Sequence, residues 1–292
     1  MNASGIVSIV IGLALIGVTL WDVFNDLFHP AARSAFGDWL ARRLFNLLRA
    51  KASLRSLAGP LAVILIILSW VLGLVVGFAM MFWPTFPQDF LTSTGAIPPN
   101  SSHTLTVIYF SFQTLITLGY GDLIPAMQPV RFLASCEALI GFGLLTASIS
   151  SVVLLYPALS RTRLLARSIA HAVESERRLG LSVIRADAES VLMSLAQQMT
   201  QARIDLIHFP ITYFFAVGND DVALSKWIFE ADRLAREGAR ELCEPATRLA
   251  ACMLEIALDE FAQIVAKRFL PHAPQERIEI FKAFAADHGV AN

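Results

Sequence analysis

Three long apolar stretches dominate the first half of the chain. They run from about Gly5 to Trp21, from Pro60 to Trp83 and from about Phe132 to Tyr156. The first two contain no Asp, Glu, Lys or Arg, and the third contains only Glu137. Because a helix needs about 20 apolar residues to cross the hydrocarbon core of a bilayer, this pattern predicts three transmembrane helices.

The first stretch has a second interpretation, a secretory signal peptide. Such a peptide needs a positively charged start and a small-residue cleavage site. Met1 to Gly5 contains no Lys or Arg, and Asp22, Phe24 and Asn25 do not resemble a cleavage site. We therefore expect a retained helix.

A shorter apolar segment, residues 103–116 (HTLTVIYFSFQTLI), lies between the second and third stretches. Fourteen residues are too few to span a bilayer, while Pro98, Pro99 and the Asn-Ser-Ser cluster at 100–102 provide a helix start. A short helix that enters and turns back leaves non-helical backbone at membrane depth, which is tolerated only inside protein or along a water-filled path. The layout predicts a pore.

Charged residues divide the chain into two halves. Residues 1–157 contain 13 charged side chains and residues 158–292 contain 34. We expect an N-terminal helix and amphipathic cytoplasmic linker over 1–58, a pore domain over 59–157 and a cytoplasmic helical domain over 158–292. The net charge of −1 gives no reason to expect a nucleic acid partner.

The distribution of basic residues predicts the orientation in the membrane. Residues 84–122 contain no Lys or Arg, whereas basic residues fill the loop between the first two stretches and follow the third: Arg33, Arg42, Arg43, Arg49, Lys51, Arg55, then Arg161, Arg163 and Arg167. By the positive-inside rule, the N-terminus faces outward and the C-terminal half is cytoplasmic. The expected location is the plasma or inner cell membrane.

The basic loop also contains an amphipathic pattern. Apolar residues recur at helical spacing, and the arginines are mostly off that face: Phe36, Trp39, Leu40, Leu44, Leu47 and Leu48, against Arg42, Arg43 and Arg49. A helix on the inner leaflet has this pattern, and so does a cytoplasmic helix packed on protein. Both interpretations remain open.

Residues 117–122 read Thr-Leu-Gly-Tyr-Gly-Asp, directly after the short apolar segment. Backbone carbonyls can replace the hydration shell of a cation if they all point at one axis, and Gly119 and Gly121 permit the required backbone angles. Leu118 and Tyr120 would then point away from the axis. Thr117 adds a hydroxyl, and Asp122 would lie at the outer mouth and attract cations.

This motif resembles the selectivity filter of potassium channels, and residues 60–157 are similar to bacterial channels with two transmembrane helices per pore domain. The resemblance implies that potassium binds at Thr117, Leu118, Gly119 and Tyr120, with Gly121 completing the ion-binding segment. Leu118 stands where Val is commoner in the family. Because the backbone carbonyl coordinates the ion, this difference in side chain should not abolish selectivity. Tyr120 is retained, which favours potassium over non-selective relatives.

The resemblance also assigns residues around the filter. Tyr109, Phe110, Gln113 and Thr114 occupy the pore-helix positions, where the aromatic rings brace the filter. Gln113 stands where some relatives have an acidic residue, so a carboxylate pair with Asp122 is impossible. Arg131 matches a basic residue at the outer end of the inner helix.

Two glycines and one acid in the third apolar stretch are further candidates. Gly141 matches the glycine at which the inner helix of relatives is thought to bend, and Gly143 offers a second flexible point. Close helix packing explains both glycines equally well. Because an ionisable group inside a membrane is costly, we expect Glu137 to pair with Ser111 or Thr114 behind the pore helix, or to face the aqueous vestibule.

The C-terminal half is predicted to be helical. Helices are expected over about Val183 to His208, after a cap at Asn219 and Asp220, from Pro245, and after Pro274, with residues 210–217 in the core. No nucleotide-binding, zinc-protease or EF-hand motif occurs in the sequence. We expect a domain that supports tetramerisation and gating, and we name no ligand for it.

Together these patterns predict an all-α membrane protein with three transmembrane helices, a re-entrant pore helix and filter loop, and a helical cytoplasmic domain. A ring of carbonyls takes four loops and the chain has one, so a homotetramer is expected. The expected function is passive potassium conduction, with K⁺ as the permeant ion and no cofactor. The alternative is a non-conducting sensor or scaffold anchored in the membrane; no catalytic constellation suggests an enzyme.

Overall fold

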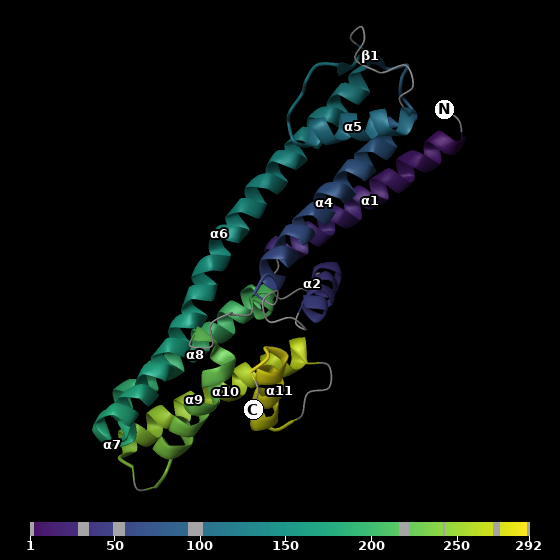
Figure 1. Ribbon diagram of the computed structural model, residues 1–292. Coiled ribbons are helices and arrows are strands. Elements are labelled where there is room, and N and C mark those ends of the chain that lie inside the picture. The colour runs from purple at the N-terminus through teal and green to yellow at the C-terminus, as the bar shows by residue number, and fades with distance from the viewer. Residues whose placement is uncertain are drawn as a thin grey trace. The chain divides into compact units, whose positions relative to one another are not determined.

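The computed structural model describes residues 3–28, 35–48, 56–92, 102–215, 222–241, 243–270 and 275–290. This part of the chain is helical apart from one short two-stranded ribbon and the connections (Figure 1). It forms two compact units, Met1–Gly37 with Ile64–Val152, and Asp38–Val63 with Val153–Asn292. The expected all-α membrane fold is confirmed.

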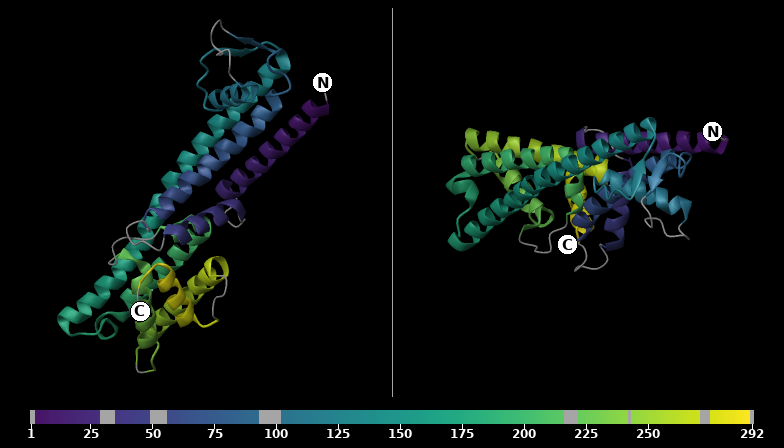
Figure 2. Two further views of the ribbon diagram at one scale, coloured as in Figure 1. Left: turned by 45° about the vertical axis from the view of Figure 1, so that its right-hand side comes forward. Right: turned by 90° about the horizontal axis from the view of Figure 1, so that it is seen from above.

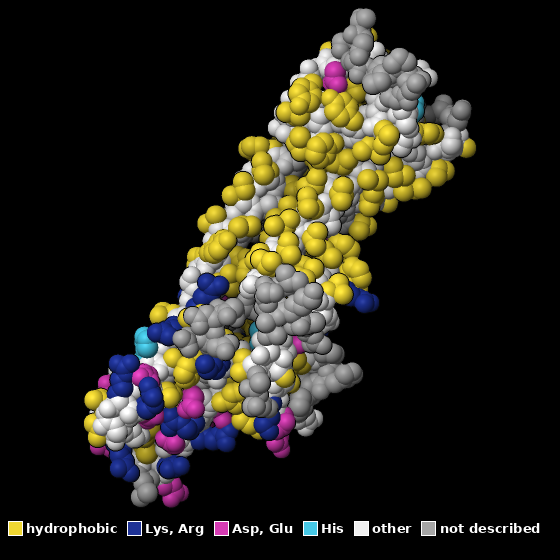
Figure 3. Space-filling view, in the orientation of Figure 1, with side chains coloured by type: hydrophobic (Ala, Val, Ile, Leu, Met, Phe, Trp, Pro, Cys, Tyr) yellow, Lys and Arg dark blue, Asp and Glu magenta, His cyan; other side chains and the backbone are white. Residues whose placement is uncertain are grey.

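The first unit contains helices at all three apolar stretches. These are α1 (Ala3–Phe28), α4 (Ala58–Phe82) and α6 (Gln128–Leu179), and each is long and apolar enough to cross a membrane. Hydrophobic side chains, yellow in Figure 3, predominate on the face of this part that is in view. The chain is therefore a multi-pass membrane protein.

Helices α1 and α4 lie side by side because small residues let their backbones approach (Figures 1 and 2). A Cβ added at Gly12 would lie 2.6 Å from the Gly77 carbonyl oxygen, and one at Gly77 would lie 2.6 Å from Cγ1 of Ile16. A Cβ at Gly73 would lie 2.6 Å from the hydroxyl of Thr19. The two glycines of α4 are four residues apart, so they form one small-residue stripe against α1.

Two hydrogen bonds fix the direction of this pair. Ser8, near the start of α1, donates its hydroxyl to the Met80 carbonyl near the end of α4, at 2.7 Å. The Trp70 indole donates to Oδ2 of Asp22 at 2.8 Å. The helices are therefore antiparallel, and the carboxyl group of Asp22 has a donor within the helix pair.

Between α4 and α6 the chain forms α5 (His103–Leu115) and a small ribbon. Strand β1 (Phe90–Thr92) pairs antiparallel with β2 (Leu123–Pro125), with Phe90 opposite Pro125. The Ala126 amide extends the pairing by donating to the Asp89 carbonyl at 2.8 Å. The sequence analysis did not predict these strands, because three residues are too few to show an alternating pattern. The proposed helix-start residues Pro98, Pro99 and Asn100 lie outside the described residues.

Helix α6 continues for 52 residues and passes through Pro157 without ending. A proline inside a helix removes one backbone hydrogen bond, but the flanking turns hold the helix together. The domain boundary placed near Pro157 thus falls inside a continuous helix, and the two compact units meet along the chain at Val152 and Val153.

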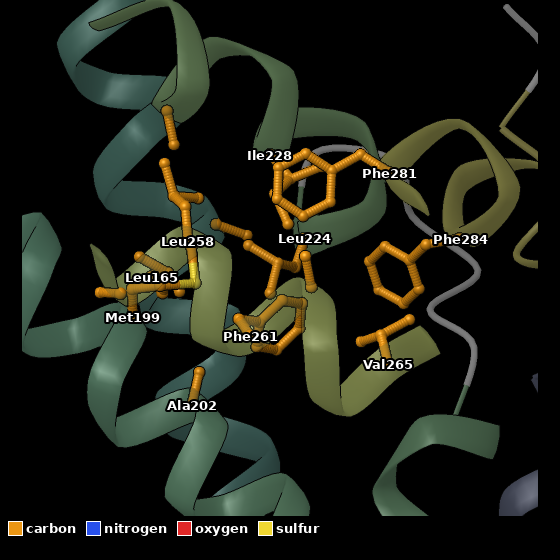
Figure 4. Packing of buried hydrophobic residues seen from close by; sticks show 14 of the residues in the cluster. Leu165, Met199, Ala202, Leu224, Ile228, Leu258, Phe261, Val265, Phe281 and Phe284 are labelled. Carbon is orange, nitrogen blue, oxygen red and sulfur yellow. The ribbon is translucent and has the colours of Figure 1, made fainter. Parts of the chain in front are cut away.

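The second unit is a bundle of helices around one apolar core (Figure 4). It contains α2 (Ala35–Leu48) from Asp38 on, the start of α4 up to Val63, the part of α6 from Val153 on, α7 (Val183–Ala186), α8 (Ala188–His208), η1 (Pro210–Phe214), α9 (Leu224–Gly238), α10 (Pro245–Phe269) and α11 (Arg277–Asp287). Helices α8 and α10 make the most extensive pair. The buried core includes Leu165, Met199, Ala202, Ile228, Leu258, Phe261, Val265 and Phe281.

The expected helices of this half are present, with one break. The helix predicted over Val183 to His208 is interrupted at Asp187, which separates α7 from α8, and it ends before Pro210 as predicted. Pro245 begins α10. Tyr213 and Phe214 are buried, in agreement with a core role for that segment. Asn219, Asp220 and Pro274 lie outside the described residues.

Candidate functional site

Helix α5 ends in a backbone turn that redirects the chain into residues 117–122. The Thr117 amide donates to the Thr114 carbonyl at 2.9 Å, and the Leu118 amide donates to the Gln113 carbonyl at 2.8 Å. These bonds occupy carbonyls that a helix end otherwise leaves without partners. The segment that follows is thereby attached to the last turn of α5.

Residues 117–121 have an unusual backbone. The φ angle is positive at every second residue, 57° at Thr117, 54° at Gly119 and 76° at Gly121. Among the described residues, Thr117 is the one non-glycine with positive φ, a conformation that is costly for a β-branched side chain. This alternation differs from an extended strand, in which φ is negative at every residue.

A hydrogen-bond network of side chains holds this loop from behind. Asp122 accepts from the Tyr109 hydroxyl through Oδ2 at 2.9 Å and from the Gln113 amide through Oδ1 at 3.2 Å. The Tyr120 backbone amide donates to Oε1 of Gln113 at 3.3 Å. Gln113 therefore connects α5 to both the loop and the acid after it, in place of the carboxylate pair that the sequence rules out.

The network also favours the charged form of Asp122. Partial burial opposes ionisation, but the hydrogen bonds donated by Tyr109 and Gln113 outweigh it, so the pKa of Asp122 lies below its ordinary value. The Leu123 amide adds a further donor at 3.0 Å. A negative charge therefore stands at the end of the loop.

The loop is exposed in a single copy of the chain. Thr117, Gly119 and Gly121 are exposed, and the larger side chains of Leu118 and Tyr120 are 49% and 68% exposed.

A second network lies on the opposite side of α5. The Ser111 hydroxyl is 2.9 Å from the Val75 carbonyl of α4 and 2.5 Å from Oε1 of Glu137 in α6. Ser111 and Glu137 are both fully buried. The carboxyl of Glu137 is therefore paired with Ser111. Through this one side chain, α5 contacts both α4 and α6.

The two glycines of α6 have different surroundings. A Cβ at Gly141 would lie 1.9 Å from the Leu115 carbonyl oxygen, whereas a Cβ at Gly143 would meet nothing within 4 Å. Gly141 permits close approach of α6 to the last turn of α5. The bending role at Gly141 and Gly143 stays a prediction.

Of the remaining candidates, Phe110 packs away from the loop, whereas Thr114 contacts its first residue. Phe110 is buried and its ring packs edge-on against Phe82 and Phe90, with centroids 5.1 and 5.0 Å away. It anchors α5 to α4 and β1. Thr114 contributes its backbone carbonyl to the turn at Thr117. Arg131 lies in the first turn of α6 and is exposed.

Sequence reasoning missed two contributors. The Val75 carbonyl and the Leu115 carbonyl carry no signal in the sequence, because any residue type supplies a backbone oxygen. In the contact between Gly141 and the Leu115 carbonyl, the sequence could point only to Gly141, because glycines in membrane helices often mark a close approach between helices.

Part of the chain is similar to known proteins. Residues 61–156 match the family described as "Ion channel". The chain is 33% identical over 72 residues to "Two pore potassium channel c" from Oryza sativa subsp. japonica, a match that covers 25% of this chain and 15% of that protein. The chain thus spans only a small part of this relative. No solved structure matches.

Proposed function

We propose that this chain, which carries a pore-loop ion channel domain over residues 61–156, forms a potassium-selective channel as a homotetramer. Four copies would place four loops around one axis, with the carbonyls of residues 117–121 replacing the water around the ion. Conduction is then passive, because the ion exchanges between successive carbonyl rings without any chemical step.

The alternating positive φ angles at Thr117, Gly119 and Gly121 carry the proposal. A loop without a binding role has no reason to adopt a strained conformation at Thr117, and such strain clusters at functional sites. The hydrogen bonds from Gln113 and Tyr109 hold the loop and its acid in place without contributing to its lining.

The exposed side chains support assembly. Leu118 and Tyr120 would be buried against neighbouring copies in a four-fold ring, which accounts for large apolar groups at the surface of one copy. Cyclic symmetry is the usual solution for identical subunits around one axis.

The charges near the loop support cation selectivity. Asp122 is favoured in its ionised form beside the outer end of the loop, and residues 84–122 contain no Lys or Arg. Apart from Arg131 at the start of α6, the basic residues lie between the first two spans and after the third. The orientation that fits has Asp122 outside and residues 158–292 in the cytoplasm of a cell membrane.

Flux from reconstituted liposomes tests the proposal. Purified protein in potassium-loaded vesicles is expected to release potassium in a barium-sensitive way and to release sodium far more slowly. Native mass spectrometry is expected to give four times the chain mass of 32.0 kDa. Equal sodium and potassium flux would reject selectivity. Absence of flux from a stable tetramer under opening conditions would favour the alternative, a non-conducting scaffold.

A further inference from the structure

Helix α2 has one face that packs on the second compact unit. Ala41 and Phe45 are each 1% exposed and belong to its apolar core. The Arg42 guanidinium donates to the carbonyls of Phe269 and Arg268, both at 2.9 Å. These carbonyls end α10, where a helix lacks internal donors. Arg42 therefore caps α10 and fixes α2 to it.

The other face of α2 is exposed. Phe36, Trp39 and Leu47 are 46%, 52% and 76% exposed, and Arg43 is exposed with its guanidinium 5.8 Å from the centre of the Trp39 ring. At 3.6 residues per turn, these four residues occupy roughly a quarter of the helix circumference. The exposed face of α2, defined by these four residues, thus combines large apolar groups with a positive charge.

This division corrects part of the sequence analysis. The apolar residues of α2 were expected on one face, with the arginines mostly elsewhere. In the structure Phe45 and the partly buried Leu44 and Leu48 face the core, while Phe36, Trp39 and Leu47 do not. The interpretation of a helix packed on protein therefore holds for one face of α2, and the inner-leaflet interpretation stays a prediction for the other.

The position of α2 in the chain keeps it close to a membrane surface. It follows α1 after residues 29–34 and precedes α4 after residues 49–57. At about 3.5 Å per residue these connections reach at most roughly 20 Å and 30 Å. Because α1 and α4 both cross the bilayer, α2 stays within roughly 20 Å of the surface where their ends emerge.

The charge around α2 fits an anionic surface. Residues 29–57 contain six Lys or Arg side chains and one acid, Asp38. Trp and Phe beside Arg are the composition found on helices that lie at the headgroup boundary, and clustered basic residues next to a transmembrane helix attract anionic lipid.

We propose that the exposed face of α2 binds the surface of a bilayer that contains anionic phospholipid. Trp39, Phe36 and Leu47 enter the boundary between headgroups and acyl chains, and Arg43 pairs with lipid phosphate. Since Arg42 and Phe45 attach the same helix to α10 and the core, α2 connects the helical unit to the lipid. The lipid composition then influences the helical unit directly, without passing through the loop at 117–121.

Spin-label accessibility in the full-length protein tests this binding. With Cys136, Cys243 and Cys252 replaced by serine, Leu47→Cys carries a nitroxide on the exposed face of α2, and Arg248→Cys carries one on the exposed side of α10 as a control. The protein is placed in nanodiscs of phosphatidylcholine alone, or of phosphatidylcholine mixed with phosphatidylglycerol. Collisions with oxygen and with a water-soluble nickel chelate are then compared.

The nitroxide at position 47 is expected to collide several-fold more with oxygen than with nickel, most strongly in the phosphatidylglycerol mixture, while the control prefers nickel. Arg43→Glu should remove the phosphatidylglycerol dependence. A label at 47 that prefers nickel overturns the proposal, and so does an immobilised label shielded from both reagents, which would place a neighbouring copy there. None of these readouts requires conduction, so failure of the proposed channel function is distinguishable.

Discussion

The carbonyl oxygen of Leu115, at the end of α5, lies 1.9 Å from the point where a Cβ on Gly141 would stand. Helix α6 therefore touches the turn from which the loop at 117–121 starts, with no space for a methyl group. Any movement of α6 at this point shifts the base of the loop, whether or not Gly141 also bends.

Gly141→Ala is expected to destabilise the first compact unit. The new methyl group must push α6 away from the Leu115 carbonyl, and overpacking of this kind costs about 1–3 kcal/mol, more than the roughly 1 kcal/mol that alanine gains in a helix. The thermal midpoint of the detergent-solubilised protein should fall. Gly143→Ala is the matched control, because its Cβ meets nothing within 4 Å, and its midpoint should stay the same or rise.

The same pair of variants separates packing from bending. If Gly141 acted only as a hinge, Gly141→Ala would alter channel opening while leaving the thermal midpoint unchanged. An unchanged midpoint would therefore contradict the packing role inferred from the Leu115 contact.

The sequence predicted the elements of the first unit because membrane helices carry strong signals. The charge-free run from Pro60 to Trp83 has few alternatives to a helix, and the short segment before Thr117 could not span. Residues 117–121 were assigned as a filter from their motif, which stays a prediction; the φ angle is positive at Gly119 and Gly121.

The contacts behind the loop were beyond sequence reasoning. Ser111 and Thr114 are both hydroxyl residues on α5, and only the rotation of that helix decides which one faces Glu137. The continuity of α6 through Pro157 was also missed, because the local rule that proline ends helices competes with the packing of both flanking segments. The packing of the folded chain determines both the rotation of α5 and the continuity of α6.

Tyr109→Phe is expected to weaken ion selectivity while leaving the fold intact. The substitution keeps the ring and removes the hydroxyl that donates to Asp122 at 2.9 Å. The lost bond loosens the link between α5 and Asp122 behind the loop, so the potassium-to-sodium flux ratio in liposomes should fall. Thr104→Val, at an exposed position of the same helix, serves as the control, and equal losses in both variants would refute the specific role.

Ser111→Ala should destabilise the protein, and Glu137→Leu should recover part of that loss. Removing the hydroxyl deprives the fully buried Glu137 of the donor to its Oε1, and a buried polar group without a partner costs about 1–3 kcal/mol. Replacing the acid as well leaves two apolar groups in contact. A double-mutant cycle of thermal midpoints measures the coupling, and strictly additive effects would show that the two residues do not interact.

Arg277→Ala is expected to loosen the helical unit. Arg277 lies 2.6 Å from the buried Asp232 of α9 and 2.8 Å from Asp259 of α10, so it joins three helices. Burial alone would lower the pKa of Arg277, but the charges of Asp232 and Asp259 outweigh it and raise the pKa. The expected loss is about 1.5–3 kcal/mol of unfolding free energy, as for a hydrogen bond to a charged group, measured by urea denaturation.

Arg248→Ala is the matched control for this variant, because Arg248 is exposed near the start of α10. It should change the unfolding free energy by less than about 0.5 kcal/mol. Equal effects of the two substitutions would show that the bridge to Asp232 and Asp259 does not stabilise the unit.

Gly119→Ala tests the backbone of the loop rather than its packing. In a single copy a Cβ at Gly119 meets nothing within 4 Å, so steric contact within the chain gives no reason for failure. The φ angle of 54° does give a reason, because an alanine in this left-handed conformation costs about 1–2 kcal/mol. In a tetramer this cost arises four times around one ion path. We expect selective potassium flux to be lost while the tetramer mass and the helical content persist. Potassium currents equal to those of the unmodified protein would mean that the carbonyls at 117–121 do not depend on this backbone geometry, and the proposed selectivity mechanism would fall with it.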